Sequence, residues 1–298
     1  MPGARDDIRA FLNRRPDSVL VEVSDVKGSA PRDAGAWMLV ARDMIFRTIG
    51  GGQLEYMAID HARKILAGGR DAPMDVPPMN VALGPEIGQC CGGRVGLSFR
   101  RVDRALADEL VGKVDAEIAT RPHVYVFGAG HVGDALAHAL SLTPVRVILV
   151  DTREAELMKF QEKWEPVFRP GFHGNYICDV PGVETCLSAM PEQVVRSAPP
   201  GSAFIVLTHD HALDFLIAAE ALQRRDAVYV GMIGSKTKKA TFKNWLKREI
   251  GREDLFEHLV CPVGGAVVKD KRPEVIAALA AAEVLTAVLT STRVSQPA

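Results

Sequence analysis

The chain has 298 residues, 47% of them hydrophobic and 24% charged, with a net charge of -1 at neutral pH. This composition is typical of globular proteins and lacks the basic excess of proteins that bind nucleic acid. A chain of this length usually folds as two domains. The first residues carry early acids and no apolar stretch, so they predict neither a signal peptide nor a membrane span. Five cysteines without paired spacing indicate a cytoplasmic, reducing environment.

The first 120 residues predict a small α+β domain. Three glycines at residues 50–52 precede Gln53 and open a helix, so this turn is either an anion site at a helix N-terminus or a plain connection between hairpin and helix. The other predicted elements follow from β-branched and turn-forming residues. They are a helix over 5–13, strands over 18–23, 37–40 and 44–47, a loop over 68–78, strands over 79–83 and 94–101, and a helix over 102–120.

Two adjacent cysteines, Cys90 and Cys91, lie in a Gly-Gln-Cys-Cys-Gly-Gly loop between the last two predicted strands. Glycines let the backbone approach a ligand closely. Consecutive side chains of an extended chain point to opposite faces, so at most one thiol faces a given ligand. The alternative is that both are small buried hydrophobic residues. An adjacent disulfide and a zinc site are disfavoured by geometry and spacing. We therefore predict that this loop is the chemical centre.

Residues 121–298 predict a doubly wound parallel sheet of the Rossmann type. A glycine-rich turn at residues 128–133 follows a strand at 123–127 and begins a helix, and the next strand ends in Asp151. In such a fingerprint Gly128 makes the tight turn, Gly130 lets a pyrophosphate approach, and Gly133 lets the helix pack on the strand. Asp151 lies where an acid holds a ribose hydroxyl. Whether a dinucleotide binds is a separate question, because a fold does not determine a function.

Two further polar segments follow predicted strands of this sheet. Ligands of open α/β sheets bind at the carboxyl ends of the strands, which makes the polar residues after the strand at 203–207 pocket candidates. These are His209, Asp210, His211 and Asp214. The alternative is that Thr208 and Asp210 cap the next helix. Ser235 precedes a lysine-rich helix that indicates either a phosphate site or a solvated face, although the spacing is not that of a P-loop.

Taken together, several motifs resemble those of the molybdenum-hydroxylase accessory proteins of the XdhC/CoxI family. They lie at residues 28–32, 50–55, 84–93, 128–133, 208–211 and 231–235. Gln53 and the two adjacent cysteines resemble the xanthine dehydrogenase branch of the family. The chain departs from the family pattern after residues 261–264, where residues 265–271 replace a glycine-rich link to the last helix.

The resemblance implies a cytoplasmic chaperone rather than an enzyme. Such a protein binds molybdenum cofactor in its molybdopterin form, protects it during sulfuration and inserts it into apo-xanthine dehydrogenase. The implied partners are that apoenzyme, a cysteine desulfurase and a cofactor-supplying protein, with a homodimer as the expected assembly and neither nucleic acid nor a membrane as a partner.

Our site hypothesis gives Cys90 or Cys91 the contact near molybdenum, Gln89 an amide contact, and the glycine turn the phosphate. The predicted cofactor-binding residues are Gln89, Cys90, Cys91, Gly128, Gly130, His131, Gly133, Asp151, His209 and Ser235. One alternative is an NAD(P)-dependent oxidoreductase that uses residues 128–151, with His209 or His211 as proton donor. Another is a scaffold that joins a sulfur donor to the dehydrogenase.

Overall fold

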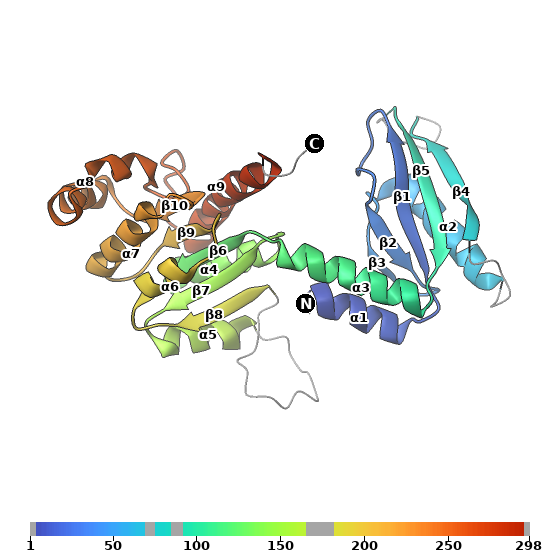
Figure 1. Ribbon diagram of the computed structural model, residues 1–298, viewed down its shortest axis with the longest axis horizontal. Helices are drawn as coiled ribbons and strands as arrows, with labels where there is room; N and C mark the ends of the chain where they lie inside the picture. Colours follow the sequence, from blue (N-terminus) through green and yellow to red (C-terminus); the bar gives the residue numbers. More distant parts are fainter. Residues whose placement is uncertain (1–3, 69–74, 85–91, 165–181, 295–298) are drawn as a thin grey trace. The chain divides into compact units, whose positions relative to one another are not determined.

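The computed structural model in Figure 1 describes residues 4–68, 75–84, 92–164 and 182–294. The chain divides into two compact units. One comprises residues 2–117 and the other comprises residues 118–298. The division falls between Glu117 and Ile118, inside helix α3 (Arg104–Ala119). The sequence predicts the boundary after residue 120, between domains of residues 1–120 and 121–298.

The N-terminal unit is an antiparallel sheet with helices on both faces. Its strand order is β3-β2-β1-β5-β4. Along β1, Val19, Val21 and Val23 pack in the core with helix α2, while Glu22 between them pairs with Lys113 of α3. This alternation follows from the two-residue period of a strand. The bounds are α1 Ala4–Arg14, β1 Val19–Lys27, β2 Trp37–Val40, β3 Ile45–Arg47, α2 Gly52–Ala67, β4 Asp75–Ala82 and β5 Arg94–Arg101.

Strand β4 starts earlier than the sequence predicted. The expected loop over residues 68–78 was wrong in its last part, because β4 already begins at Asp75 and includes Pro77 and Pro78. The pairing with β5 is irregular between Val76 and Met79, where the two prolines lie. Proline lacks the N–H that a ladder needs, so it is tolerated at irregularities and in edge strands, and β4 is an edge strand.

The C-terminal unit is built on a parallel sheet of the strand order β11-β10-β9-β6-β7-β8. The chain starts in the middle at β6, winds outward through β7 and β8, then returns to β9 and winds the other way. The order therefore reverses between β6 and β9, which is where ligands of such sheets bind. The bounds are β6 His123–Phe127, β7 Arg146–Asp151, β8 Val183–Leu187, β9 Ala203–Val206, β10 Tyr229–Met232 and β11 Leu259–Val260.

Helices cover both faces of this sheet (Figure 1). Val124 and Val126 of β6 belong to the core shared with α4, α5 and α9, whereas Tyr125 and Phe127 belong to the core shared with α6, α7 and α8. The predicted fold class, a parallel doubly wound unit beside a smaller α+β unit, is confirmed in this respect. The bounds are α4 His131–Ser141, α5 Glu154–Trp164, α6 Pro191–Ser197, α7 His211–Gln223, α8 Lys236–Trp245 and α9 Pro273–Val294.

Helix α9 is apolar enough for its composition alone to permit a membrane crossing. Its segment Pro273–Ser291 has a mean hydropathy of 1.7. The inward side of the helix packs into the core that α4 shares with the sheet, through Ala277, Ala280 and Val284. A helix that contributes to a protein core can show the same hydropathy, and 28% of this segment is buried.

Candidate functional site

The glycine turn between β6 and α4 has a different requirement at each of its three glycines. Gly128 has φ of 109°, and a Cβ there would lie 2.6 Å from the carbonyl oxygen of Leu207. A Cβ on Gly133 would lie 1.8 Å from the Gly128 oxygen, so the helix reaches the strand only without a side chain. Beside Gly130 no described atom lies within 4 Å of a Cβ. The turn thus leaves its open side at the N-terminus of α4, where backbone N–H groups favour an anion.

Asp151 at the end of β7 is buried and fully engaged within the protein. Its Oδ2 accepts hydrogen bonds from the Ala129 N–H at 2.7 Å and from Arg153 Nη2 at 3.0 Å. Its Oδ1 accepts from the Arg153 N–H at 2.9 Å and from Arg153 Nε at 3.0 Å. Burial acts to raise the pKa of this carboxyl, but the hydrogen bonds from Arg153 and Ala129 outweigh burial and lower the pKa below its ordinary value.

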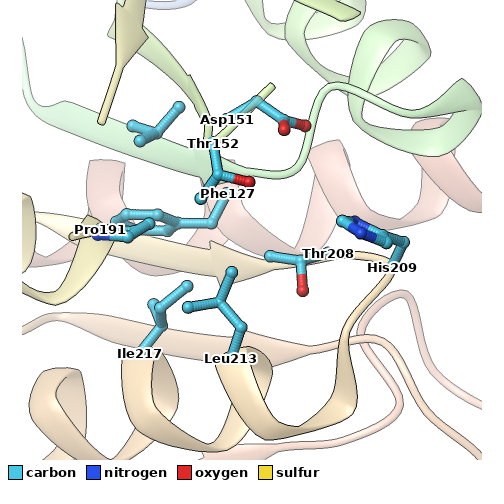
Figure 2. A pocket seen from close by; sticks show the side chains of 9 residues that line it. Phe127, Asp151, Thr152, Pro191, Thr208, His209, Leu213 and Ile217 are labelled. Atoms are coloured by element: carbon cyan, nitrogen blue, oxygen red, sulfur yellow. The ribbon is translucent and has the colours of Figure 1, made fainter. Parts of the chain in front are cut away.

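A small recess lies beside this turn, at the carboxyl ends of β6, β7 and β9. Its empty volume of about 210 Å³ includes open solvent, and the space left for the centre of a water-sized sphere is about 10 Å³, which is room for about one water molecule. Figure 2 shows Asp151 and Thr152 on one side of it and Leu213 and Ile217 on the opposite side. Its lining is mostly apolar, with polar groups at its rim. The lining residues are Phe127, Val150, Asp151, Thr152, Pro191, Thr208, His209, Leu213 and Ile217.

The polar segment after β9 is organised mainly by the start of α7. Asp210 caps this helix by accepting hydrogen bonds from the N–H groups of Ala212 and Leu213, at 2.8 and 3.4 Å. Thr208 donates its hydroxyl hydrogen to Asp214 at 2.7 Å, and its N–H also bonds Asp214 at 3.0 Å. The helix-capping interpretation of Asp210 is therefore confirmed. Asp214 is completely buried and forms an ion pair with Lys238 of α8.

The predicted histidines and Ser235 do not gather in one place. His209 is exposed and lines the recess, whereas His131 and His211 are exposed at the first positions of α4 and α7. Ser235 follows β10, is not among the residues that line the recess, and caps α8 by accepting a hydrogen bond from the Lys238 N–H at 3.2 Å. Of the sequence-predicted residues, the structure thus brings together the glycine turn, Asp151 and His209.

In the N-terminal unit, three glycine-rich segments meet beside β1 and β5. A Cβ on Gly93 would lie 2.2 Å from the carbonyl oxygen of Ser29, and Ser29 pairs with Gly92 in an isolated bridge. A Cβ on Gly50 would lie 2.6 Å from the Pro31 side chain. Residues 28–32 therefore contact both the turn at residues 50–52 and Gly93, the last residue of the double-cysteine segment (residues 88–93). These close approaches require glycine at Gly93 and Gly50.

The turn before α2 holds an anion supplied by the chain itself. Glu55 Oε2 accepts hydrogen bonds from the N–H groups of Ile49 at 3.0 Å and Gly51 at 3.1 Å, and the Thr48 hydroxyl also donates to it. Glu55, in the first turn of α2, thus closes this turn with a carboxylate of the chain itself, and binding of a separate anion at the N-terminus of α2 stays a prediction.

Gln89 and the two proposed metal contacts, Cys90 and Cys91, lie outside the described residues. Gly92 and Gly93 on one side and Leu83 on the other are described, and backbone hydrogen bonds join Leu83 to both glycines. Within the described part of the chain, no group of three or more His, Cys, Asp or Glu side chains could hold a metal ion. Two cysteines there are free thiols, Cys186 and the buried Cys261. Burial raises the pKa of both thiols.

Sequence reasoning missed several residues of the recess. Pro191 begins α6, a helix of seven residues without clear periodicity, and the preceding strand β8 is short and partly exposed. Thr152 and Arg153 were overlooked although they directly follow Asp151. The position after an acidic strand end in a dinucleotide fingerprint was the available signal for them.

Comparison with known proteins gives matches over both units. Residues 124–284, more than half of the chain, match the model of the XdhC Rossmann domain, and residues 12–76 match that of the XdhC and CoxI family. The uncharacterized protein YqeB of Escherichia coli (strain K12) is 24% identical over 267 residues. This alignment covers 89% of the chain but only 42% of the length of YqeB.

A solved structure shares the fold. It is a crystal structure described as a xanthine dehydrogenase from Bacillus halodurans, with a TM-score of 0.75 and 16% sequence identity. The match covers 99% of this chain and 98% of that one. At this identity the likeness establishes the fold alone.

Proposed function

This chain belongs to the XdhC and CoxI family, and from that premise we propose that it is an accessory protein in the maturation of xanthine dehydrogenase. In this role it binds molybdenum cofactor, protects it while its terminal sulfur is installed, and delivers it to the apoenzyme in the cytoplasm. The protein itself is a carrier rather than an enzyme. Its partners are the apo-dehydrogenase, a cysteine desulfurase as sulfur source and a protein that supplies the cofactor.

The observation that carries this proposal is the family match together with the meeting of glycine-rich segments in the N-terminal unit. Ser29 and Gly93 pack so closely that the backbone around residues 28–32 is held against the end of the double-cysteine segment. A carrier needs backbone donors and soft sulfur that can be presented to a metal. In our proposal Cys90 or Cys91 supplies the sulfur and Gln89 supplies an amide.

The C-terminal unit, taken by itself, offers one position that suits a phosphate group. The open side of Gly130 leaves room for an anion at the N-terminus of α4, a fit that a side chain at this position would reduce. His131, at the first position of this helix, lies beside it. The bound cofactor supplies the molybdenum chemistry, and the protein's own residues bind, orient and shield it.

The test is cofactor retention and transfer. The purified chain is incubated with molybdenum cofactor, passed through gel filtration, and assayed for pterin and molybdenum, then for activation of apo-xanthine dehydrogenase. We expect stoichiometric pterin and molybdenum to co-elute and the apoenzyme to gain activity. Absence of pterin in the protein peak would refute the proposed role.

Substitutions separate the sulfur contact from the rest of the proposal. The double variant Cys90→Ala/Cys91→Ala should lose most retained molybdenum, whereas Cys186→Ala, which removes a half-buried thiol of β8, should retain it. If the double variant binds and transfers cofactor like the unchanged protein, the two cysteines are not the contact. Retention of NADH without pterin would instead favour the oxidoreductase alternative.

A further inference from the structure

The loop between β11 and α9, residues 265–272, carries the most exposed large apolar side chain among the described residues. Val267 is 95% exposed, and Val268 beside it is 47% exposed. Both lie outside the two described cores of the C-terminal unit. A single exposed apolar residue is ordinary, but here two are adjacent, in the segment where the sequence departs from the glycine-rich link of the family. Packing within the unit therefore does not account for them.

Both ends of this loop are held by hydrogen bonds. At its start, the Gly264 N–H donates to the carboxylate of Glu283 in α9 at 2.6 Å. At its end, the Asp270 carboxylate accepts from the N–H of Arg272 at 2.9 Å and from Nη2 of Arg272 at 2.6 Å, directly before α9 begins. The two valines are thus presented on a fixed base, which lowers the entropy cost of binding them.

The charges beside the two valines are positive. Lys269 and Lys271 are both exposed, and the described part of the chain gives neither lysine an ion-pair partner. The acid of the loop, Asp270, is already paired with Arg272 at 2.6 Å. The tip therefore combines two apolar side chains with two uncompensated cations. Its complement is an apolar depression bordered by carboxylates.

This loop lies at the edge of the sheet that also offers the position suited to a phosphate group. Strand β11 runs parallel to β10, and the loop follows its carboxyl end. Gly130 follows the carboxyl end of β6, which is parallel to β9 in the same sheet. A protein that takes a ligand from this edge has to approach this edge, where the loop is exposed.

We propose that residues 265–272 are the element through which the apo-dehydrogenase docks on this chain. Val267 and Val268 enter an apolar depression of the apoenzyme, and carboxylates at its border face Lys269 and Lys271. The inference deepens the proposed function and rests on it. It assigns this surface to the protein that receives the cofactor, rather than to the sulfur source, a lipid surface or a second copy of the chain.

The test is calorimetric titration of the purified full chain into apo-xanthine dehydrogenase, with no cofactor present. Val267→Ser/Val268→Ser should weaken binding at least about tenfold, because it removes the apolar area that the contact buries. Lys269→Glu/Lys271→Glu should weaken binding at least about tenfold at low ionic strength and by a smaller factor at high salt, where charges are screened. Unchanged affinity in both variants, or no binding of the unchanged chain, overturns the proposal.

Leu142→Ser and Arg225→Glu are matched controls at the opposite edge of the same sheet. Leu142 is 78% exposed at the end of α4, and Arg225 is exposed shortly after α7. Helices that connect parallel strands run back across the sheet, so both residues lie at its amino edge. Both controls should bind the apoenzyme like the unchanged chain. Equal weakening in the controls and in the loop variants overturns the assignment to this loop.

Cofactor retention separates failure of this inference from failure of the proposed function. The loop variants should retain pterin and molybdenum after gel filtration, yet activate the apoenzyme at least about tenfold less at sub-saturating concentration. If the unchanged chain retains no pterin, the proposed function fails, and titration without cofactor still decides the docking.

A different occupant of the loop is tested with the same variants. They are titrated with the cysteine desulfurase, sedimented with phosphatidylglycerol vesicles, and examined for self-association by analytical ultracentrifugation. We expect each of these measurements to be the same for the loop variants and the unchanged chain. If the loop variants bind the apoenzyme normally but lose one of these other interactions, the docking proposal is overturned.

Discussion

Lys238 of α8 and Asp214 of α7 form an ion pair that is buried inside the C-terminal unit. The Asp214 side chain has no exposed surface and that of Lys238 is 8% exposed. The same carboxylate accepts two hydrogen bonds from Thr208, at the carboxyl end of β9. One buried pair thus holds the start of α8, the first turn of α7 and the loop that forms one wall of the recess.

Removing one member of this pair should destabilise the protein strongly. Lys238→Met leaves Asp214 as a buried, partly compensated charge, and we expect a loss of about 3–5 kcal/mol in the free energy of unfolding. Urea denaturation measures this loss. Lys236→Met, at an exposed position of the same helix, is the control and should change it by less than about 0.5 kcal/mol.

The double variant Lys238→Met/Asp214→Asn tests the coupling. Its destabilisation should be smaller than the sum of the two single changes, because no uncompensated charge stays buried. Additive losses would mean that the two side chains do not interact in solution.

Two glycines of the same turn should lose very different amounts of stability when one methyl group is added. Gly133→Ala places a Cβ against the Gly128 oxygen, and we expect a loss of about 3 kcal/mol or more, or no folded protein. Gly130→Ala meets open space and should cost less than about 1 kcal/mol. Thermal denaturation separates the two. Because the open side of Gly130 is the proposed phosphate position, Gly130→Ala should nevertheless weaken retention of the molybdenum cofactor, and unchanged retention would contradict that placement.

The stabilisation that Asp151 provides should depend on pH. Its pKa is lowered in the folded chain, so its contribution is present above the unfolded pKa and is lost as pH falls through the folded pKa. We expect Asp151→Asn to cost about 1–3 kcal/mol at pH 7 and progressively less below about pH 4. Denaturation across this range tests the expectation. Glu184→Gln, at a half-exposed ion pair, is the control and should cost less than about 1 kcal/mol at pH 7.

Glu55 should stabilise the N-terminal unit through the turn before α2. Glu55→Ala leaves the N–H groups of Ile49 and Gly51 without this acceptor, and we expect a loss of about 1–3 kcal/mol. Asp60→Ala is a matched control on the same helix. Asp60 forms an exposed pair with Lys64, so its loss should cost about 0.5 kcal/mol or less. Equal losses in the two variants would show that the Glu55 contacts are not maintained in solution.

Much of the C-terminal unit could be predicted from sequence because its signals are local. Residues 123–133 combine a strand, the glycine turn and the start of a helix within one short segment. The strand at Ala203–Val206 is continuously apolar because it is covered on both faces. Strand β8 and helix α6 escaped prediction. They are short, and β8 alternates weakly because it lies at the sheet edge.

The sequence by itself determined the fold class, the two-part organisation of motifs and the chemistry available at each glycine-rich turn, because these depend on residue types a few positions apart. Only the tertiary structure decided which groups are already occupied. Glu55 fills the turn that predicted an anion site, and Arg153 saturates Asp151. It also brought residues 28–32 against Gly93 and Gly50, which are distant in sequence. Such pairings depend on strand order and close backbone approach, which no local pattern encodes.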